Sequence, residues 1–121
     1  MRIGPFKVVN LCPHPIRVRR GAQYLTIPKS GRVARLVFDS ANPRRVDDID
    51  FVATRVVCAK GLPEPQRGVL LIVSSMVRNA FVERDDLVSP ALVQVGPDSV
   101  LYCEGLASNL GLTMRLVELS A

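Results

Sequence analysis

Alternation between apolar and polar residues runs through the first half of the chain, and this period of two predicts β-strands. The clearest example is Ile16-Arg17-Val18-Arg19, whose two arginines are expected on the solvent face. Similar runs bounded by turn residues predict four further strands: Phe6–Asn10, Tyr24–Ile27, Val33–Phe38 and Phe51–Ala59. We expect the strands of this region to form an antiparallel meander.

The middle of the chain carries the strongest local signals. Residues 69–73 are apolar throughout, which is typical of a central strand covered on both faces. Ser74 or Ser75 follows as the candidate N-cap of a helix of about nine residues. The apolar side chains of this helix fall on one stripe: Met76, Val77, Ala80 and Phe81. Because so short a helix is unstable alone, we expect it to pack on the sheet.

Polar stretches and turns separate the remaining elements. We expect loops at 39–50 and 105–111, and a rigid connector with two prolines at 61–68. The C-terminal part is predicted to contain three short strands, the first two joined by a turn at residues 96–98: Leu92–Val95, Val100–Cys103 and Thr113–Leu119. The predicted fold is a single sheet-rich α+β domain over residues 1–121, mainly an antiparallel meander with one short helix packed on a central strand.

Composition refines this picture. A chain of 121 residues is long enough for one aliphatic core, and with no Trp and few aromatics it offers no base-stacking platform. The sequence shows neither an apolar run of about 18 residues nor a secretory signal, so we expect a cytoplasmic protein without a membrane partner.

Charge is unevenly distributed. Residues 1–45 hold ten Lys and Arg against one acid, a net +9, whereas residues 46–121 carry a net −4. Such a split predicts either an anionic partner or two surfaces that pair with each other or across subunits, as in a homo-oligomer. Nucleic acid is a less favoured partner, because no aromatic residues interleave the basic ones and no helix suits a major groove.

The end of the central apolar run is the best candidate for a binding site. A buried strand that enters a helix directly leaves free backbone N–H groups beside Ser74 and Ser75. Arg78 lies one turn further on, and Arg67 comes just before the strand. These residues predict a cradle for a phosphate or carboxylate, although the serines also suit a plain helix cap. The basic N-terminal region adds three further candidate ligand-binding residues: His14, Arg17 and Arg35.

Cys12 and His14 form a second candidate pair, because a thiol and an imidazole two residues apart suggest nucleophilic catalysis. No third group that would hold the base is evident. A histidine that fixes the surrounding Cys-Pro-His-Pro turn is the simpler interpretation. One histidine and three scattered cysteines match no zinc spacing, so the sequence predicts no metal and no cofactor. The acid pairs Asp47-Asp48 and Asp85-Asp86 are expected to be solvated rather than catalytic.

Several short motifs occur together between about residue 8 and residue 90: NLCPHP at 10–15, IPKSG at 27–31, GLPEPQRG at 61–68, LIVS at 71–74 and RDDLV at 84–88. They resemble an uncharacterised family of small proteins from phages and actinobacteria, whose members read NLTPH, IPPSG, GLPxPxxG and YIVSxxVA. Cys12, Lys29 and Leu71 stand where that family has Thr, Pro and an aromatic residue. The family has no assigned activity, and the resemblance implies an accessory or host-interaction role by analogy only.

These observations lead to one functional hypothesis and two alternatives. The first is a small phage-type accessory protein that binds an anionic, nucleotide-derived ligand without turnover, in an anti-defence or regulatory role and in the host cytoplasm if phage-encoded. One alternative is a protein-binding or self-assembling module. The other is a thiol-dependent enzyme that uses Cys12 and His14.

Overall fold

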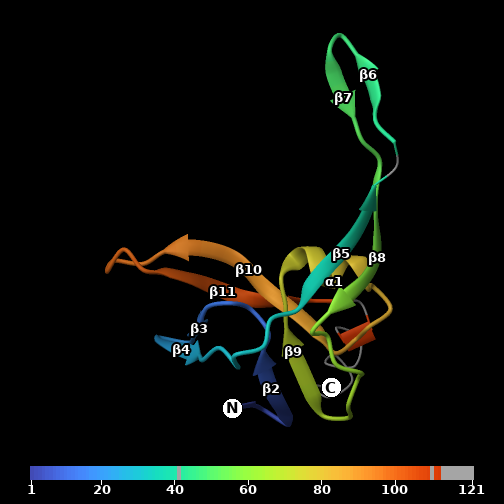
Figure 1. The fold of residues 1–121 in the computed structure, drawn as a ribbon. Coiled ribbons are helices and arrows are strands. Elements are labelled where there is room, and N and C mark those ends of the chain that lie inside the picture. Colours follow the sequence, from blue (N-terminus) through green and yellow to red (C-terminus); the bar gives the residue numbers. More distant parts are fainter. Residues whose placement is uncertain (41, 110, 113–121) are drawn as a thin grey trace.

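The computed structural model describes residues 1–40, 42–109 and 111–112, and most of this part is β-structure (Figure 1). Within it, the main sheet has seven strands, in the order β1 (Arg2–Ile3), β2 (Phe6–Asn10), β9 (Val69–Ile72), β10 (Leu87–Val95), β11 (Leu101–Ser108), β3 (Ile16–Arg20) and β4 (Gln23–Ile27). Two further strand pairs join β5 (Arg35–Ser40) to β8 (Thr54–Lys60), and β6 (Arg44–Val46) to β7 (Ile49–Phe51). Helix α1 spans Ser75–Ala80.

The main sheet is curled and mixed. The β2–β9, β9–β10 and β11–β3 pairs are parallel, whereas the β1–β2, β3–β4 and β10–β11 pairs are antiparallel. The expected antiparallel meander is therefore not confirmed, although a sheet-rich fold with one short helix is. The physical reason lies after β2, where Pro13 and Pro15 turn the chain away, so that β3 joins the sheet on its opposite side.

Strand β9 is an interior strand between β2 and β10, and its side chains enter two hydrophobic clusters, as expected for a strand covered on both faces. Leu70 and Ile72 pack into the cluster on the inner face of the curled sheet. Leu71 and Val73 pack on the outer face, where α1 covers them through Val77. Because alternate residues of a strand point to opposite faces, a strand that is apolar throughout suits this doubly covered position.

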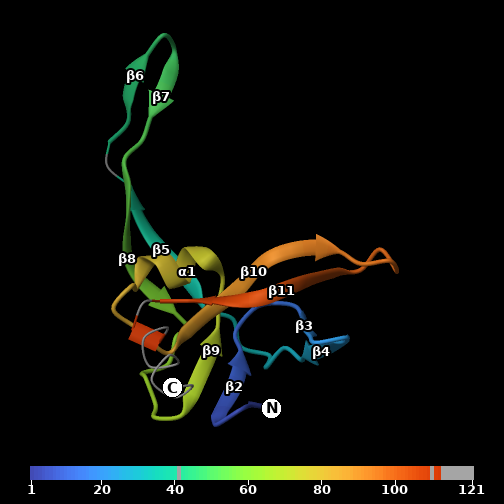
Figure 2. The same ribbon diagram turned by 180° about the vertical axis from the view of Figure 1, so that it is seen from behind.

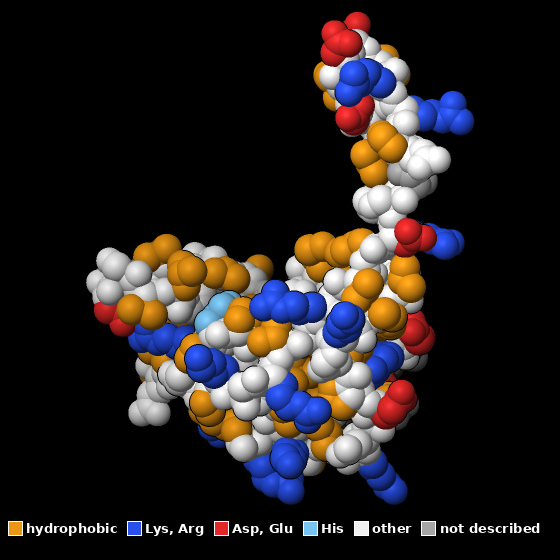
Figure 3. Space-filling view, viewed as in Figure 1, with side chains coloured by type: hydrophobic (Ala, Val, Ile, Leu, Met, Phe, Trp, Pro, Cys, Tyr) orange, Lys and Arg blue, Asp and Glu red, His pale blue; other side chains and the backbone are white. Residues whose placement is uncertain are grey.

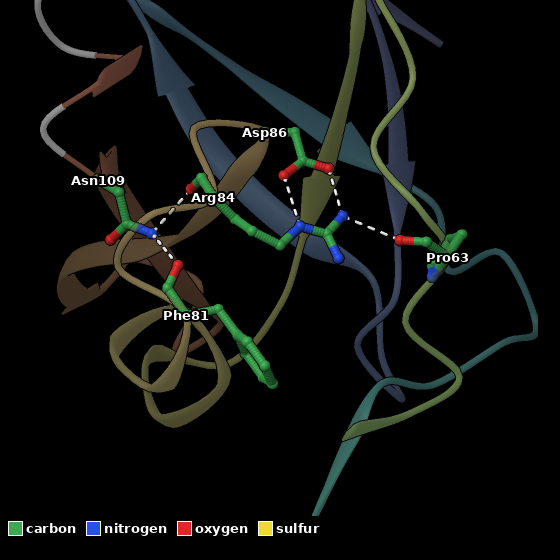
Figure 4. A network of polar contacts seen from close by, with 5 residues as sticks. All are labelled: Pro63, Phe81, Arg84, Asp86 and Asn109. Atoms are coloured by element: carbon green, nitrogen blue, oxygen red, sulfur yellow. Dashed lines mark hydrogen bonds and ion pairs between the residues drawn. The ribbon is translucent and has the colours of Figure 1, made fainter. Parts of the chain in front are cut away.

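Helix α1 has six residues, fewer than expected, and both its ends are capped by side chains. The Ser74 hydroxyl accepts a hydrogen bond from the Val77 amide at 3.2 Å. At the other end, the Asn109 amide donates to the carbonyls of Phe81 at 3.0 Å and Arg84 at 2.9 Å (Figure 4). Side chains of the protein thus satisfy one backbone group at the start of the helix and others at its end.

Two hairpins project from the body of the protein in different directions (Figure 1). Figure 2 shows the same arrangement from behind. We call residues 35–60 the long arm; its stem is β5–β8 and its tip is β6–β7. We call the end of the β10–β11 hairpin, residues 92–102, the short arm. The prediction of a loop at 39–50 is wrong, because most of these residues belong to strands of the long arm. Asp47 and Asp48, with φ of 52° and 58°, form the two-residue turn of a hairpin in which both central residues are left-handed.

The short arm begins at an irregularity in β10. Cys103 and Leu106 both pack in the inner cluster, although an odd separation in a regular strand would place them on opposite faces. Leu92, with φ of 55°, lies in the left-handed region opposite this interval of β11 and accounts for the change of face. As a result, the apolar face that forms the core continues along the short arm.

Strand β11 extends to Ser108 and occupies most of the stretch that was expected to be a loop at 105–111. The predicted strand at Thr113–Leu119 lies outside the described residues. Within the described ranges, none of the helical structure is long and apolar enough to cross a membrane.

Candidate functional site

The predicted anion cradle beside α1 is occupied by contacts within the protein. The Ser74 hydroxyl caps the helix. The Arg78 guanidinium donates from Nε to the Ser89 hydroxyl at 2.8 Å and from Nη1 to the Asn109 side chain at 3.2 Å. Ser75 is exposed at the first helical position. Arg78 therefore serves to join α1 to β10 and to Asn109, and the plain helix cap is the better interpretation of Ser74.

The remaining predicted site residues are not brought together into one site. Arg67 lies at the opposite end of β9 from Ser74, so four strand residues at roughly 3.3 Å each separate them. Arg35 and Ser74 line one groove, whereas His14 and Arg17 line another. The structure thus divides the predicted ligand-binding residues between separate surfaces.

The first groove lies between the base of the long arm and α1 and has a volume of about 330 Å³. Phe38 and Met76 contribute to it and remain 48% and 61% exposed. Arg35 is the charged residue of this lining, which is otherwise mainly apolar: Leu11, Cys12, Pro13, Val33, Ala34, Leu36, Phe38, Ser74, Met76 and Val77.

The second groove lies against the short arm and has a volume of about 380 Å³. Val93 and Leu101 project into it from the short arm and are 56% and 60% exposed. Its other lining residues come from the turn after β2, from β3 and from β10–β11: His14, Pro15, Ile16, Arg17, Pro90, Tyr102 and Cys103.

The turn at Cys12–Pro15 separates the grooves, because its first two residues line one and its last two line the other. The buried Asn10 side chain holds this turn. Its amide donates to the carbonyls of His14 at 3.0 Å and Ile27 at 3.2 Å, and its oxygen accepts from the Cys12 amide at 2.9 Å. We call the two grooves and this turn the inter-arm floor. Hydrophobic side chains gather along the short arm and at the base of the long arm on either side of it (Figure 3).

Arg17 anchors the short arm to the sheet. Its Nη1 lies 3.0 Å from the Asp98 carboxylate at the end of that arm, and its guanidinium carbon lies 4.0 Å from the centre of the Tyr24 ring. The Val100 backbone N–H and then Arg17 hold the pKa of Asp98 below its usual range. Asp98 therefore stays ionised at neutral pH, and the pair contributes to the position of the arm until the pH falls through the lowered pKa.

The long arm exposes a second set of apolar side chains at its tip. Val46, Ile49 and Phe51 share one face of the β6–β7 hairpin with Arg44, which is paired with Phe51, and the three apolar side chains are 58–60% exposed. The opposite face carries the Arg45–Asp50 ion pair, at 3.0 Å. Such a hairpin has the pattern of a sheet with one buried face, but no described residue of this chain buries it. An isolated two-stranded hairpin is at best marginally stable in water.

Cys12 and His14 do not form a thiol–imidazole pair. Cys12 is buried, and its Sγ lies 3.9 Å from the Ile72 carbonyl. The His14 ring is exposed, and its Nδ1 lies 3.1 Å from the Pro15 carbonyl. Burial raises the pKa of the Cys12 thiol, which disfavours the thiolate that a nucleophile requires. In the described part of the chain, no three His, Cys, Asp or Glu side chains come together as metal ligands.

We expect iodoacetamide to modify Cys58 at the rate of an ordinary exposed thiol and Cys12 and Cys103 far more slowly. Cys58 is exposed, whereas burial raises the pKa of both other thiols. Mass spectrometry of the native protein over a series of times and pH values measures this, and the urea-unfolded protein is the control in which all three rates converge. Rapid modification of Cys12 at neutral pH would instead restore the thiol-enzyme hypothesis.

The exposed apolar arms are the features that the sequence-based candidates missed. One local signal was present, since Val46-Asp47-Asp48-Ile49 places two turn residues between β-branched ones. Comparison of the chain with protein-family models, with curated proteins and with solved structures finds no match, so the resemblance drawn from its motifs stays a prediction.

Proposed function

We propose that this protein is a self-assembling structural module whose arms and inter-arm floor bind further copies of the chain. The observation that carries this proposal is the apolar face of the long-arm tip, formed by Val46, Ile49 and Phe51, which the described residues leave exposed. A two-stranded hairpin with one apolar face needs a covering surface, and a protein partner supplies one.

The short arm supports the same proposal independently. Val93, Val95 and Leu101 continue the inner face of the sheet past the end of the core and are 56–67% exposed. The ion pair between Arg17 and Asp98 links the end of this arm to β3. Such a link reduces the freedom of the arm, and a surface that is less flexible before binding loses less conformational entropy on binding.

The exposed apolar side chains of the arms supply a favourable contribution to such an interface. Full burial of a Val, Ile, Leu or Phe side chain contributes about 1.5–3 kcal/mol. The six arm side chains named above are all more than half exposed, so each has about 1 kcal/mol or more still to gain from burial. The basic first third of the chain and the acidic remainder add charge complementarity between copies, which favours encounter and register more than affinity.

Sedimentation velocity over a wide concentration range, at low and at high salt, tests the proposal. We expect species larger than the monomer that persist at high salt, because burial of apolar surface dominates, with faster association at low salt. A monomer at every concentration and salt would contradict self-assembly. Binding of an anionic ligand has less support, because Ser74 and Arg78 are engaged within the fold and the other candidate residues lie apart.

A further inference from the structure

We propose that the tip of the long arm, Arg44–Phe51, of one copy docks on the inter-arm floor of a second copy. This inference rests on the self-assembly proposed above and specifies which surfaces meet. The tip offers an apolar face of Val46, Ile49 and Phe51. The floor offers two mainly apolar grooves of about 330 and 380 Å³ on either side of one turn.

Charge complementarity favours this pairing of surfaces. Asp47 and Asp48 occupy the turn at the end of the tip, where acidic side chains gather in Figure 3. Neither forms an ion pair with a described residue. On the floor, Arg35 lines the first groove and is likewise without an ion pair in the described part, and His14 lines the second. Residues 44–51 carry three acids and two arginines, a net −1, and the acidic part of the tip is its turn. The acidic turn of one copy therefore complements the arginine in the first groove of the next.

The direction of the long arm makes the contact intermolecular. Both ribbon views show the tip projecting away from the body of its own chain, far from the floor at the base of the arms (Figures 1 and 2). Each copy then offers one tip and one floor, which are different surfaces. Such a heterologous interface builds a closed ring when its rotation closes, or an open filament when it does not.

Two pairs of substitutions separate the surfaces, each with a matched control. Ile49→Thr with Phe51→Thr removes two of the three apolar side chains of the tip and places a β-branched residue, which suits a strand, at each position. Its control, Arg45→Thr with Asp50→Thr, changes the opposite face of the same hairpin. Met76→Glu with Leu101→Glu places an acid in each groove, at side chains that are 61% and 60% exposed. Its control, Asn79→Glu with Gln94→Glu, adds the same charge at exposed positions outside both groove linings.

The decisive experiment mixes the tip variant with the floor variant and measures masses by native mass spectrometry and sedimentation. We expect each variant alone to associate at least about tenfold more weakly than the wild type, and both controls to assemble as the wild type does. The mixture should form a pair of one copy of each and grow no further, because the intact tip of one variant meets the intact floor of the other. As a milder variant, Asp47→Asn with Asp48→Asn keeps residues that tolerate positive φ, and should weaken assembly and reduce its salt dependence.

Each other outcome overturns the inference. Two monomeric variants that remain monomers when mixed show that the intact tip of one does not bind the intact floor of the other. If only one of the two variants loses assembly, the contact is symmetric and uses one surface twice. Variants that assemble like the wild type show that copies associate elsewhere, and self-assembly itself then survives. A monomeric wild type overturns both the docking mode and the proposed function.

Discussion

Replacing Arg84 with methionine is expected to lower the free energy of unfolding by about 3 kcal/mol, because it leaves a buried carboxylate without its partner. The Arg84 guanidinium holds both oxygens of Asp86, at 3.0 and 2.6 Å, and also donates to the Pro63 carbonyl at 2.9 Å (Figure 4). The two side chains are 15% and 6% exposed. Urea unfolding at neutral pH, followed by far-UV circular dichroism, measures the loss.

The double substitution Arg84→Met with Asp86→Leu is the control. Removing both charges avoids an unpaired buried ion, so most of the lost stability should return. A matched surface pair provides the contrast: Arg55→Met breaks the exposed pair with Asp39 and should change the free energy of unfolding by less than about 1 kcal/mol. If Arg84→Met and Arg55→Met cost the same, the buried pair does not hold the fold.

The Arg84–Asp86 pair lies between the segments that lead to the two arms. Pro63 belongs to the connector that follows β8, the last strand of the long arm, whereas Asp86 directly precedes β10, which carries the short arm. The Asp86 carbonyl also accepts from the Leu71 amide of β9 at 2.8 Å. Arg84 thus ties the connector from the base of one arm to the start of the strand that forms the other.

Local patterns of apolar and polar residues predicted two kinds of strand, those that alternate and those that are apolar throughout. Ile16–Arg20 alternates, and the apolar run at 69–73 has no polar face, so each is recognisable without knowledge of its neighbours. The parallel pairing of β2 with β9 joins segments about sixty residues apart along the chain, and nothing in either segment specifies the other. The expected meander went unconfirmed for this reason, because periodicity identifies strands but not their partners.

The candidate site was harder to predict than the fold. Ser74 and Arg78 looked available in the sequence, but their hydrogen bonds to Val77 and Ser89 depend on tertiary packing. Ile49 and Phe51 show the reverse error, since in the sequence they look like ordinary core residues. Only the three-dimensional structure shows that no described residue covers them. A sequence pattern distinguishes an apolar face from a polar one, but it does not show whether the same chain supplies the covering surface.

Replacing Asn10 with leucine is expected to lower the free energy of unfolding by about 3 kcal/mol. One backbone N–H and two backbone carbonyls then lose their hydrogen-bond partner together. Asn10 is 1% exposed, and its side chain bonds the Cys12 amide and the carbonyls of His14 and Ile27. Leucine has a similar shape, so the loss reports the hydrogen bonds rather than a cavity. Because these bonds hold the turn between the two grooves, the same substitution should also weaken assembly.

The substitution Asn10→Asp distinguishes this network from simple packing through its pH dependence. A carboxylate at this position still accepts from the Cys12 amide but faces the carbonyl oxygens of His14 and Ile27, which disfavours the charged form. Its pKa in the folded protein is therefore raised above that in the unfolded chain. The stability of this variant relative to the wild type is therefore highest below the pKa of an aspartic acid in the unfolded chain, about 3.9. This relative stability is lost as the pH rises through the pKa of the carboxyl in the folded protein. Urea unfolding of both proteins across the acid range measures this difference. A stability difference that stays constant with pH would mean that the Asn10 amide does not donate to these carbonyls, and the turn would then owe its shape to its prolines alone.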